Sequence, residues 1–163
     1  MIETIEYRPI GLVHSPFKTP EGTPIQPPAA AGIRAEVEIM PEFVEALKDL
    51  EGFSHIILLY HFHRAGAFKP VVKPFLDDSA HGLFATRAPA RPNPIGLSVV
   101  RLVSVDKNRL IIEDADIVDN SPVLDIKPYA PVFDVREESV KTGWLETGAG
   151  WNEKTRDDGR FAR

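Results

Sequence analysis

Cysteine is absent from the 163-residue sequence, and this absence excludes disulfide bonds, thiolate metal sites and a cysteine nucleophile. Long hydrophobic runs are absent too, because no stretch approaches the roughly 18 apolar residues that span a bilayer. Residues 1–6 are acidic, whereas the start of a signal peptide is basic. We therefore expect a cytoplasmic protein that does not enter a membrane.

Several familiar ligand-binding motifs are also missing. The sequence has no P-loop, no GxGxxG after a predicted strand, no GxSxG elbow and no HExxH. A nucleotide-derived ligand is therefore not expected in a Rossmann crevice. The length and the hydrophobic fraction of 43% are typical of a soluble protein with a real hydrophobic core.

Excess positive charge is confined to the middle of the chain. The net charge of −5 argues against a nucleic-acid partner. From His61 to Arg101, however, six basic and two acidic residues give +4, which leaves −9 on the other 122 residues. This distribution is typical of an anion-binding site on an otherwise acidic surface.

Proline, by contrast, is abundant, and three of the 15 prolines stand at positions 89, 92 and 94. Proline fixes its own φ and favours extended geometry in the residue before it, so residues 85–96 are expected to form a stiff loop. Arg87 and Arg91 project from this loop beside Asn93, and Gly96 is expected to adopt a backbone angle that other residues avoid. Guanidinium groups on a stiff frame suit a carboxylate or a phosphate. The alternative is a connector whose arginines face water.

Short apolar segments, alternating or continuous, predict strands, and one more strand follows the turn at residues 119–122. The predicted strands cover residues 8–14, 33–39, 53–63, 82–86, 97–105 and 110–118. The continuous apolar centre of residues 53–63 predicts a strand that is buried on both faces.

The remaining segments are irregular or only briefly helical. Pro41 opens a short helix that stops at Gly52, and residues 15–28 hold five prolines in a long loop. The predicted fold class is therefore all-β, a small β-barrel of mostly antiparallel strands with one short helix and long proline-rich loops. We expect the barrel domain over residues 1–136 and a polar tail over residues 137–163, with Trp144 and Trp151 as side chains that dock the tail.

His61 and His63 stand two apart in a predicted strand, so both side chains are expected to point to the same side. Such a pair can bind zinc, but no third ligand stands at a familiar spacing. We therefore expect no metal, and instead a hydrogen-bonded pair beside Arg64 at the mouth of a site. A metal-dependent hydrolase that uses His61, His63 and His81 is the alternative.

Five stretches of the sequence resemble the TsaA-like family, which is also called TrmO. They are Ile10–Phe17, Gly52–His55, His61–Arg64, Phe84–Gly96 and Asp116–Tyr129. The fourth contains ATRxxxRPNPIG and the last contains DxxPVLDIKPY, and both patterns are specific. The resemblance spans roughly residues 7–134.

The resemblance implies a small β-barrel enzyme that uses S-adenosylmethionine and forms a homodimer to complete its sites. The family methylates N6 of threonylcarbamoyladenosine, so tRNA, bound through its anticodon loop, is the implied partner. The match implies a set of cofactor-binding residues: Gln26, Pro27, Pro28, His63, Arg64, Arg87, Leu97, Val123, Leu124, Asp125 and Ile126.

Further residues in the matched motifs are expected to act on the substrate. Arg91 and Asn93 are predicted to bind it, and Asp125, Lys127 and Asp119 are predicted to act in catalysis. The acceptor nitrogen lies next to a carbonyl and is weakly nucleophilic, so a base helps, and Asp125 is our first candidate before Asp119 and His63.

Other interpretations stay open for these residues and for the protein. Arg91 or Lys127 offers a cation for the threonyl carboxylate. Asp125 and Lys127 share one strand face, and a structural ion pair is the alternative for these two residues. The acidic net charge and the missing C-terminal domain of many bacterial relatives depart from the family. A different methyl acceptor, or a non-catalytic sensor that binds S-adenosylmethionine, is therefore the alternative function.

Overall fold

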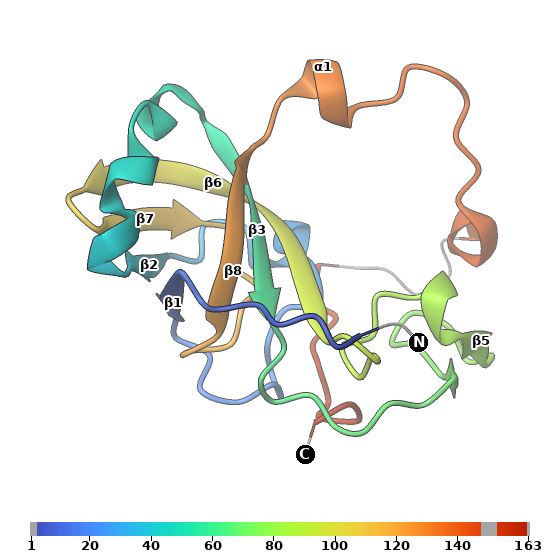
Figure 1. The fold of residues 1–163 in the computed structure, drawn as a ribbon. Helices are drawn as coiled ribbons and strands as arrows, with labels where there is room; N and C mark the ends of the chain where they lie inside the picture. Colours follow the sequence, from blue (N-terminus) through green and yellow to red (C-terminus); the bar gives the residue numbers. More distant parts are fainter. Residues whose placement is uncertain (1–2, 148–152, 163) are drawn as a thin grey trace.

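The computed structural model describes residues 3–147 and 153–162 and contains a closed barrel of six antiparallel strands (Figure 1). The strands follow one another around the barrel in the order β1-β2-β7-β6-β3-β8. Their bounds are Gly11–His14 for β1, Ala35–Ile39 for β2, His55–His61 for β3, Ile95–Asp106 for β6, Arg109–Glu113 for β7 and Pro122–Pro128 for β8. The predicted all-β barrel is confirmed.

Alternation of side chains fills the barrel interior. In β2, Ala35, Val37 and Ile39 are buried while the two glutamates between them lie outside. In β3, Ile56 and Leu58 are buried, but their neighbours in the strand are only half-buried. The prediction that β3 is buried on both faces is therefore wrong, because an antiparallel barrel covers only the inner face of each strand.

Two of the predicted strands are shorter than expected, because a local turn or backbone conformation interrupts each of them. The segment predicted as a strand at 82–86 contains only the end of β5 (His81–Gly82), which pairs with β4 (Val71–Val72), and a 3-10 turn follows at Leu83–Ala85. In that turn the amide and the hydroxyl of Thr86 both donate to the Leu83 carbonyl. The strand predicted to reach residue 118 ends at Glu113, because Asp114 adopts a left-handed backbone with φ of 65°.

Helical structure is short throughout the described residues. The helix expected after Pro41 is a 3-10 helix at Pro41–Leu47, followed by another at Leu50–Gly52. Further 3-10 turns lie at Pro27–Ala30 and Gly143–Thr147, and α1 spans Pro131–Asp134. No helix in this part of the chain is long and apolar enough to cross a membrane.

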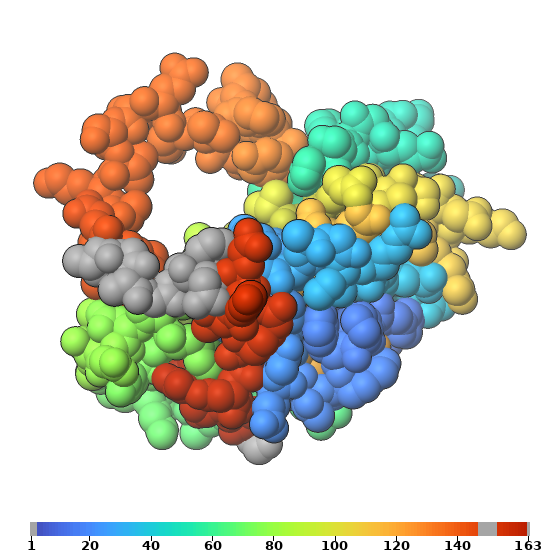
Figure 2. All heavy atoms as spheres, turned by 180° about the vertical axis from the view of Figure 1, so that it is seen from behind, coloured from blue at the N-terminus to red at the C-terminus, as the bar shows by residue number. Residues whose placement is uncertain are grey.

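A second, smaller apolar cluster lies beside the barrel and is built from loop residues. Its buried members are Val72, Leu83, Ala88, Ala90 and Phe161, with Phe75 packed against them. Phe161 comes from residues 153–162, which lie between the loop region and the N-terminal third of the chain (Figure 2). Part of the predicted polar tail, residues 153–162, is thus packed against the body, while residues 148–152, which include Trp151, lie outside the described residues.

Residues 130–145 form an arc that stands away from the barrel and encloses open space (Figures 1 and 2). Its far end is held by Trp144, whose indole Nε1 donates to the Ala85 carbonyl at 2.8 Å and whose ring stacks on His81 at 4.6 Å. Along the arc, Val132 and Phe133 are 83% and 78% exposed.

Gly96 in β6 has a steric role that differs from the expected one. The glycines with positive φ among the described residues are Gly22, Gly32, Gly143 and Gly159, so the prediction of an unusual backbone angle at Gly96 is wrong. Gly96 is paired with Tyr60 of β3, and a Cβ added at Gly96 would lie 2.5 Å from the Tyr60 ring and 3.0 Å from that of Phe62. The two rings therefore occupy the space that a side chain at position 96 would fill.

We expect Gly96→Ala to destabilise the protein by about 1–3 kcal/mol, because the added methyl group must displace the Tyr60 ring from a packed position. Denaturant unfolding measures this loss. Gly82→Ala is the matched control, since nothing lies within 4 Å of a Cβ at that position. Equal stability of the two variants would contradict the steric role of Gly96.

Candidate functional site

A cavity of about 710 Å³ lies where the end of β3 and the start of β6 meet the loops. Cavities of this size commonly bind small molecules and cofactors. The barrel contributes Tyr60, Gly96 and Leu97, and the proline-rich loop contributes Phe84 to Pro89 and Arg91. The cavity is therefore built at the junction between the barrel and the second apolar cluster.

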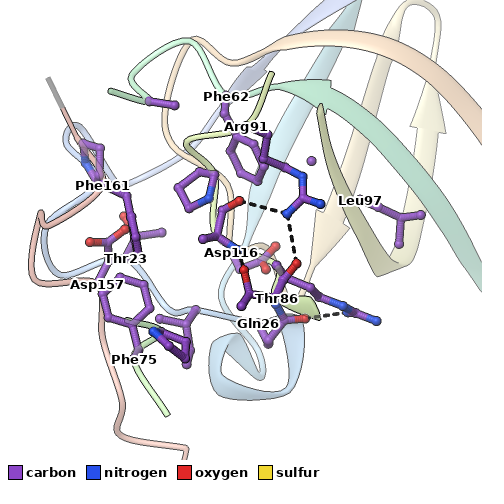
Figure 3. A pocket seen from close by; sticks show the side chains of 18 of the residues that line it. Thr23, Gln26, Phe62, Phe75, Thr86, Arg91, Leu97, Asp116, Asp157 and Phe161 are labelled. Carbon is purple, nitrogen blue, oxygen red and sulfur yellow. Dashed lines mark hydrogen bonds between the residues drawn. The ribbon is translucent and has the colours of Figure 1, made fainter. Parts of the chain in front are cut away.

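Six of the residues predicted for the cofactor and substrate line this one cavity: Gln26, His63, Arg64, Arg87, Arg91 and Leu97. They come from four separate parts of the sequence. The Arg87 Nη1 atom donates to the Gln26 Oε1 atom at 2.9 Å, which joins the two proline-rich loops across the site (Figure 3). Arg87 is exposed, so its guanidinium also faces solvent.

Arg91 holds the proline-rich loop in shape. Its Nη1 atom donates to the carbonyls of Thr86 at 2.9 Å and Ala88 at 3.3 Å, and its guanidinium lies over the Phe84 ring at 5.7 Å (Figure 3). Arg91 therefore does not simply face water. Asn93, the other residue predicted to bind substrate, is exposed and does not line the cavity.

His63 presents a buried ring atom without a partner. Its Nδ1 atom lies 3.3 Å from the Ser121 hydroxyl, and its Nε2 atom is buried without a hydrogen bond. Burial lowers the pKa of His63, and the positive charge of Arg64 lowers it further. The imidazole is therefore neutral at pH 7 and has one nitrogen to offer to a ligand.

The other predicted site residues lie outside the cavity lining. Pro27 and Pro28 begin the 3-10 turn next to Gln26, and Val123 is fully buried in the barrel core. On β8, Leu124 is half-buried and Ile126 packs against the core. Asp125 and Lys127 form an ion pair of 2.8 Å, as the structural interpretation of these two residues expects.

Asp119 is occupied by contacts with the loop after β1. Its carboxylate accepts hydrogen bonds from the Ser15 amide at 2.9 Å and from Lys18 Nζ at 2.8 Å. The hydrogen bond from Lys18 lowers the pKa of Asp119, and the Ser15 amide adds to this. Asp119 therefore remains an anion that fixes the loop geometry near His63, and its catalytic role stays a prediction.

Asp116 lines the cavity, although the sequence did not single it out as a site residue. The Ser98 hydroxyl donates to its Oδ1 atom at 2.6 Å, and the Tyr60 hydroxyl lies 3.1 Å from Ser98 Oγ. Burial raises the pKa of Asp116 to about 6, against the lowering effects of the Ser98 hydrogen bond and the Arg87 charge. The sequence signal that could have indicated Asp116 is an acidic residue between two apolar ones, Ala115 and Ile117. In the structure both of these apolar residues are fully buried.

Aromatic rings complete the cavity wall. Tyr60 and Phe62 meet edge to face at 5.3 Å, and Phe84, Phe75 and Phe161 line other parts of the wall. Aromatic faces suit a stacked heterocycle. Among the described residues, no group of three His, Cys, Asp or Glu side chains could hold a metal ion.

Residues 12–135 match the model of the tRNA-methyltransferase O N-terminal domain. The chain belongs to the TrmO family. A "probable S-adenosyl-L-methionine-binding protein" of Pyrococcus abyssi is 61% identical over 155 residues, which is 95% of this chain and 84% of the relative. The "tRNA (adenine(37)-N6)-methyltransferase" of Escherichia coli is 36% identical and covers 80% of this chain.

A solved structure shares this fold. The crystal structure of TrmO from Pseudomonas aeruginosa superposes with a TM-score of 0.72 and is 40% identical over 87% of this chain. The chain spans 63% of that structure and 60% of the Escherichia coli enzyme, so both are longer proteins.

The residues of the cavity fit S-adenosylmethionine, the cofactor of this family. Arg64 and Arg87 offer guanidinium groups to a carboxylate, and the aromatic wall suits an adenine ring. The buried Nε2 atom of His63 supplies one more polar contact.

Proposed function

We propose that this protein is an S-adenosylmethionine-dependent methyltransferase that acts on N6 of threonylcarbamoyladenosine 37, next to the anticodon of tRNA. The observation that carries the proposal is the single cavity that gathers Gln26, His63, Arg64, Arg87 and Leu97. The names of the Escherichia coli and mouse relatives support the tRNA adenine as acceptor. The threonylcarbamoyl group rests on the family resemblance alone.

When bound, S-adenosylmethionine supplies a methyl group whose bond to sulfur breaks as the bond to the acceptor nitrogen forms. Methyl transfer needs an in-line approach, so much of the rate comes from residues that hold both partners in position. Arg87, bonded to Gln26, is poised to hold a carboxylate at the cavity mouth. The rings of Phe62 and Phe84 line the cavity and offer apolar surface to the ligand.

The acceptor nitrogen must lose its proton, and Asp116 is our candidate to receive it. Asp116 lines the cavity, is held in place by Ser98 and has a pKa raised to about 6, so it is both ionised and basic at pH 7. Asp125 keeps its predicted role if a partner subunit brings β8 to the cavity of its neighbour. The two carboxylates are therefore tested together.

The exposed apolar arc of residues 130–145 supports a homodimer as the functional form. Val132 and Phe133 on α1, like Val135 and Val140 after it, face solvent in one chain, and such apolar surface is typical of an interface. We expect the wild type to sediment as a dimer and Phe133→Ser to shift it toward monomer. A wild type that stays monomeric at micromolar concentration would contradict this form.

The first test of the function is cofactor binding. We expect calorimetric titration with S-adenosylmethionine to show binding that Arg87→Ala weakens about 10–100-fold, because a charge-assisted hydrogen bond contributes about 1.5–3 kcal/mol. Arg109→Ala is the matched control, since Arg109 is paired with Glu36 on the barrel surface, outside the cavity lining. Absence of binding by the folded wild type would refute the cofactor assignment.

The second test is methyl transfer to tRNA that carries threonylcarbamoyladenosine, with tRNA lacking this modification as the control. Asp116 accepts a proton only as the carboxylate, so activity is expected to rise with pH through about 6. Asp116→Asn is expected to lower kcat about 100-fold, with cofactor binding retained, and Asp125→Ala measures the contribution of the other carboxylate.

Three outcomes of this assay carry distinct meanings. Full turnover by Asp116→Asn removes Asp116 as the base, and full turnover by Asp125→Ala removes Asp125. Tight cofactor binding without transfer to any RNA identifies the non-catalytic sensor. Transfer to another acceptor keeps the enzyme and changes its substrate.

A further inference from the structure

The wall of the cavity continues beyond the part of the chain that matches the family domain. The match ends at residue 135, but Trp144, Leu145, Asp157 and Phe161 also line the cavity. Asp157 and Phe161 belong to residues 153–162, which we call the C-terminal segment. Figure 3 shows both side chains, with Thr23 and Phe75, on the side of the cavity that lies opposite Gln26 and Leu97.

Backbone hydrogen bonds tie the C-terminal segment to two loops that are far away in sequence. The Gly22 amide donates to the Asp157 carbonyl at 2.8 Å, and the Asp157 amide donates to the Thr23 carbonyl at 2.9 Å. Further along, the Gly66 amide donates to the Phe161 carbonyl at 2.7 Å. Residues of both loops, such as Thr23 and Ala65, line the cavity. The C-terminal segment therefore fixes two walls of the cavity at once.

Side chains of the segment fix a third wall. The Phe161 ring is 9% exposed and meets the Phe75 ring edge to face at 5.2 Å. The Arg160 guanidinium lies over the Phe75 ring at 4.8 Å and donates to the Pro74 carbonyl at 3.2 Å. Phe75 and Pro74 line the cavity, and the segment therefore clamps them from outside.

Asp157 places a carboxylate in the cavity wall. Its Oδ1 atom accepts a hydrogen bond from the Gly159 amide at 2.7 Å, which uses one of about four lone-pair sites of a carboxylate. Burial raises the pKa of Asp157, and the neighbouring charge of Asp158 adds to this effect. Hydrogen-bond donors of a ligand would complete the solvation of this carboxylate.

We propose that the C-terminal segment is part of the S-adenosylmethionine site. In this proposal, which rests on the proposed function, the Phe161 ring closes an apolar wall and the Asp157 carboxylate accepts hydrogen bonds from hydroxyl or amino groups of the ligand. The segment thus adds specificity from outside the family domain. Neither residue is a member of the cofactor set that the motifs imply.

Calorimetric titration of the 163-residue protein with S-adenosylmethionine tests the proposal. We expect Asp157→Asn to weaken binding about tenfold, because a hydrogen bond to a charged group becomes a neutral one. Asparagine keeps the size of the side chain and an acceptor for the Gly159 amide, so the segment is expected to keep its fold. Phe161→Ala is expected to weaken binding at least as much, through loss of an apolar wall.

Glu153→Gln is the matched control, because it removes the same charge from an exposed residue of the segment that does not line the cavity. It is expected to bind like the wild type. If the wild type binds and Asp157→Asn and Phe161→Ala bind within twofold of it, the segment is only structural and the proposed function stands. If the folded wild type does not bind, the proposed function fails and this inference fails with it.

Discussion

The pairing of β3 with both β6 and β8 is the interaction on which the rest of the molecule depends. His55–His61 aligns with β6 along its whole length, and the same strand pairs with β8 on its other edge. This register sets Tyr60 opposite Gly96, so the Tyr60 ring lies across β6 and its hydroxyl reaches Ser98. Ser98 in turn holds Asp116. A slip of the register would break this polar chain.

The same strand also delivers the chain to the cavity. Immediately after β3, Phe62, His63 and Arg64 supply an aromatic ring, a neutral imidazole and a guanidinium to one wall. The tight turn is closed by the His63 amide, which donates to the His61 carbonyl at 2.9 Å. The end of β3 thus places three chemically different side chains at the cavity.

The basic residues between His61 and Arg101 have different roles in the folded protein. Arg101 pairs with Glu113 on the barrel, Lys73 pairs with Asp78, and Arg91 is used to hold the proline-rich loop. Arg64 and Arg87 remain at the cavity as exposed cations. The clustering of charge in the sequence indicated the right region, but pairing reduces the number of cations that can face a ligand.

Local pattern predicted the barrel well, because alternation records which face of each strand is buried. It failed at residues 82–86 and 114–118, where a Thr86 turn and the left-handed Asp114 override apolar composition. The family motifs named six residues that share the cavity, but Asp116 was missed because its environment depends on Ser98 of β6, which is distant in sequence. Phe161 was missed because its contact with Phe75 spans chain segments that no periodicity connects.

The hydrogen bonds between residues 22–23 and Asp157 have a consequence for biosynthesis. A ribosome releases the barrel strands first, since the last of them ends at Pro128, and they have all their pairing partners without residues 153–162. The cavity, however, gains Asp157 and Phe161 only when these late residues emerge and reach back across almost the whole chain. Such distant contacts form slowly because of the entropy of closing a long loop. Asp157 and Phe161 are therefore the last of the described cavity residues to be synthesised, after every strand of the barrel.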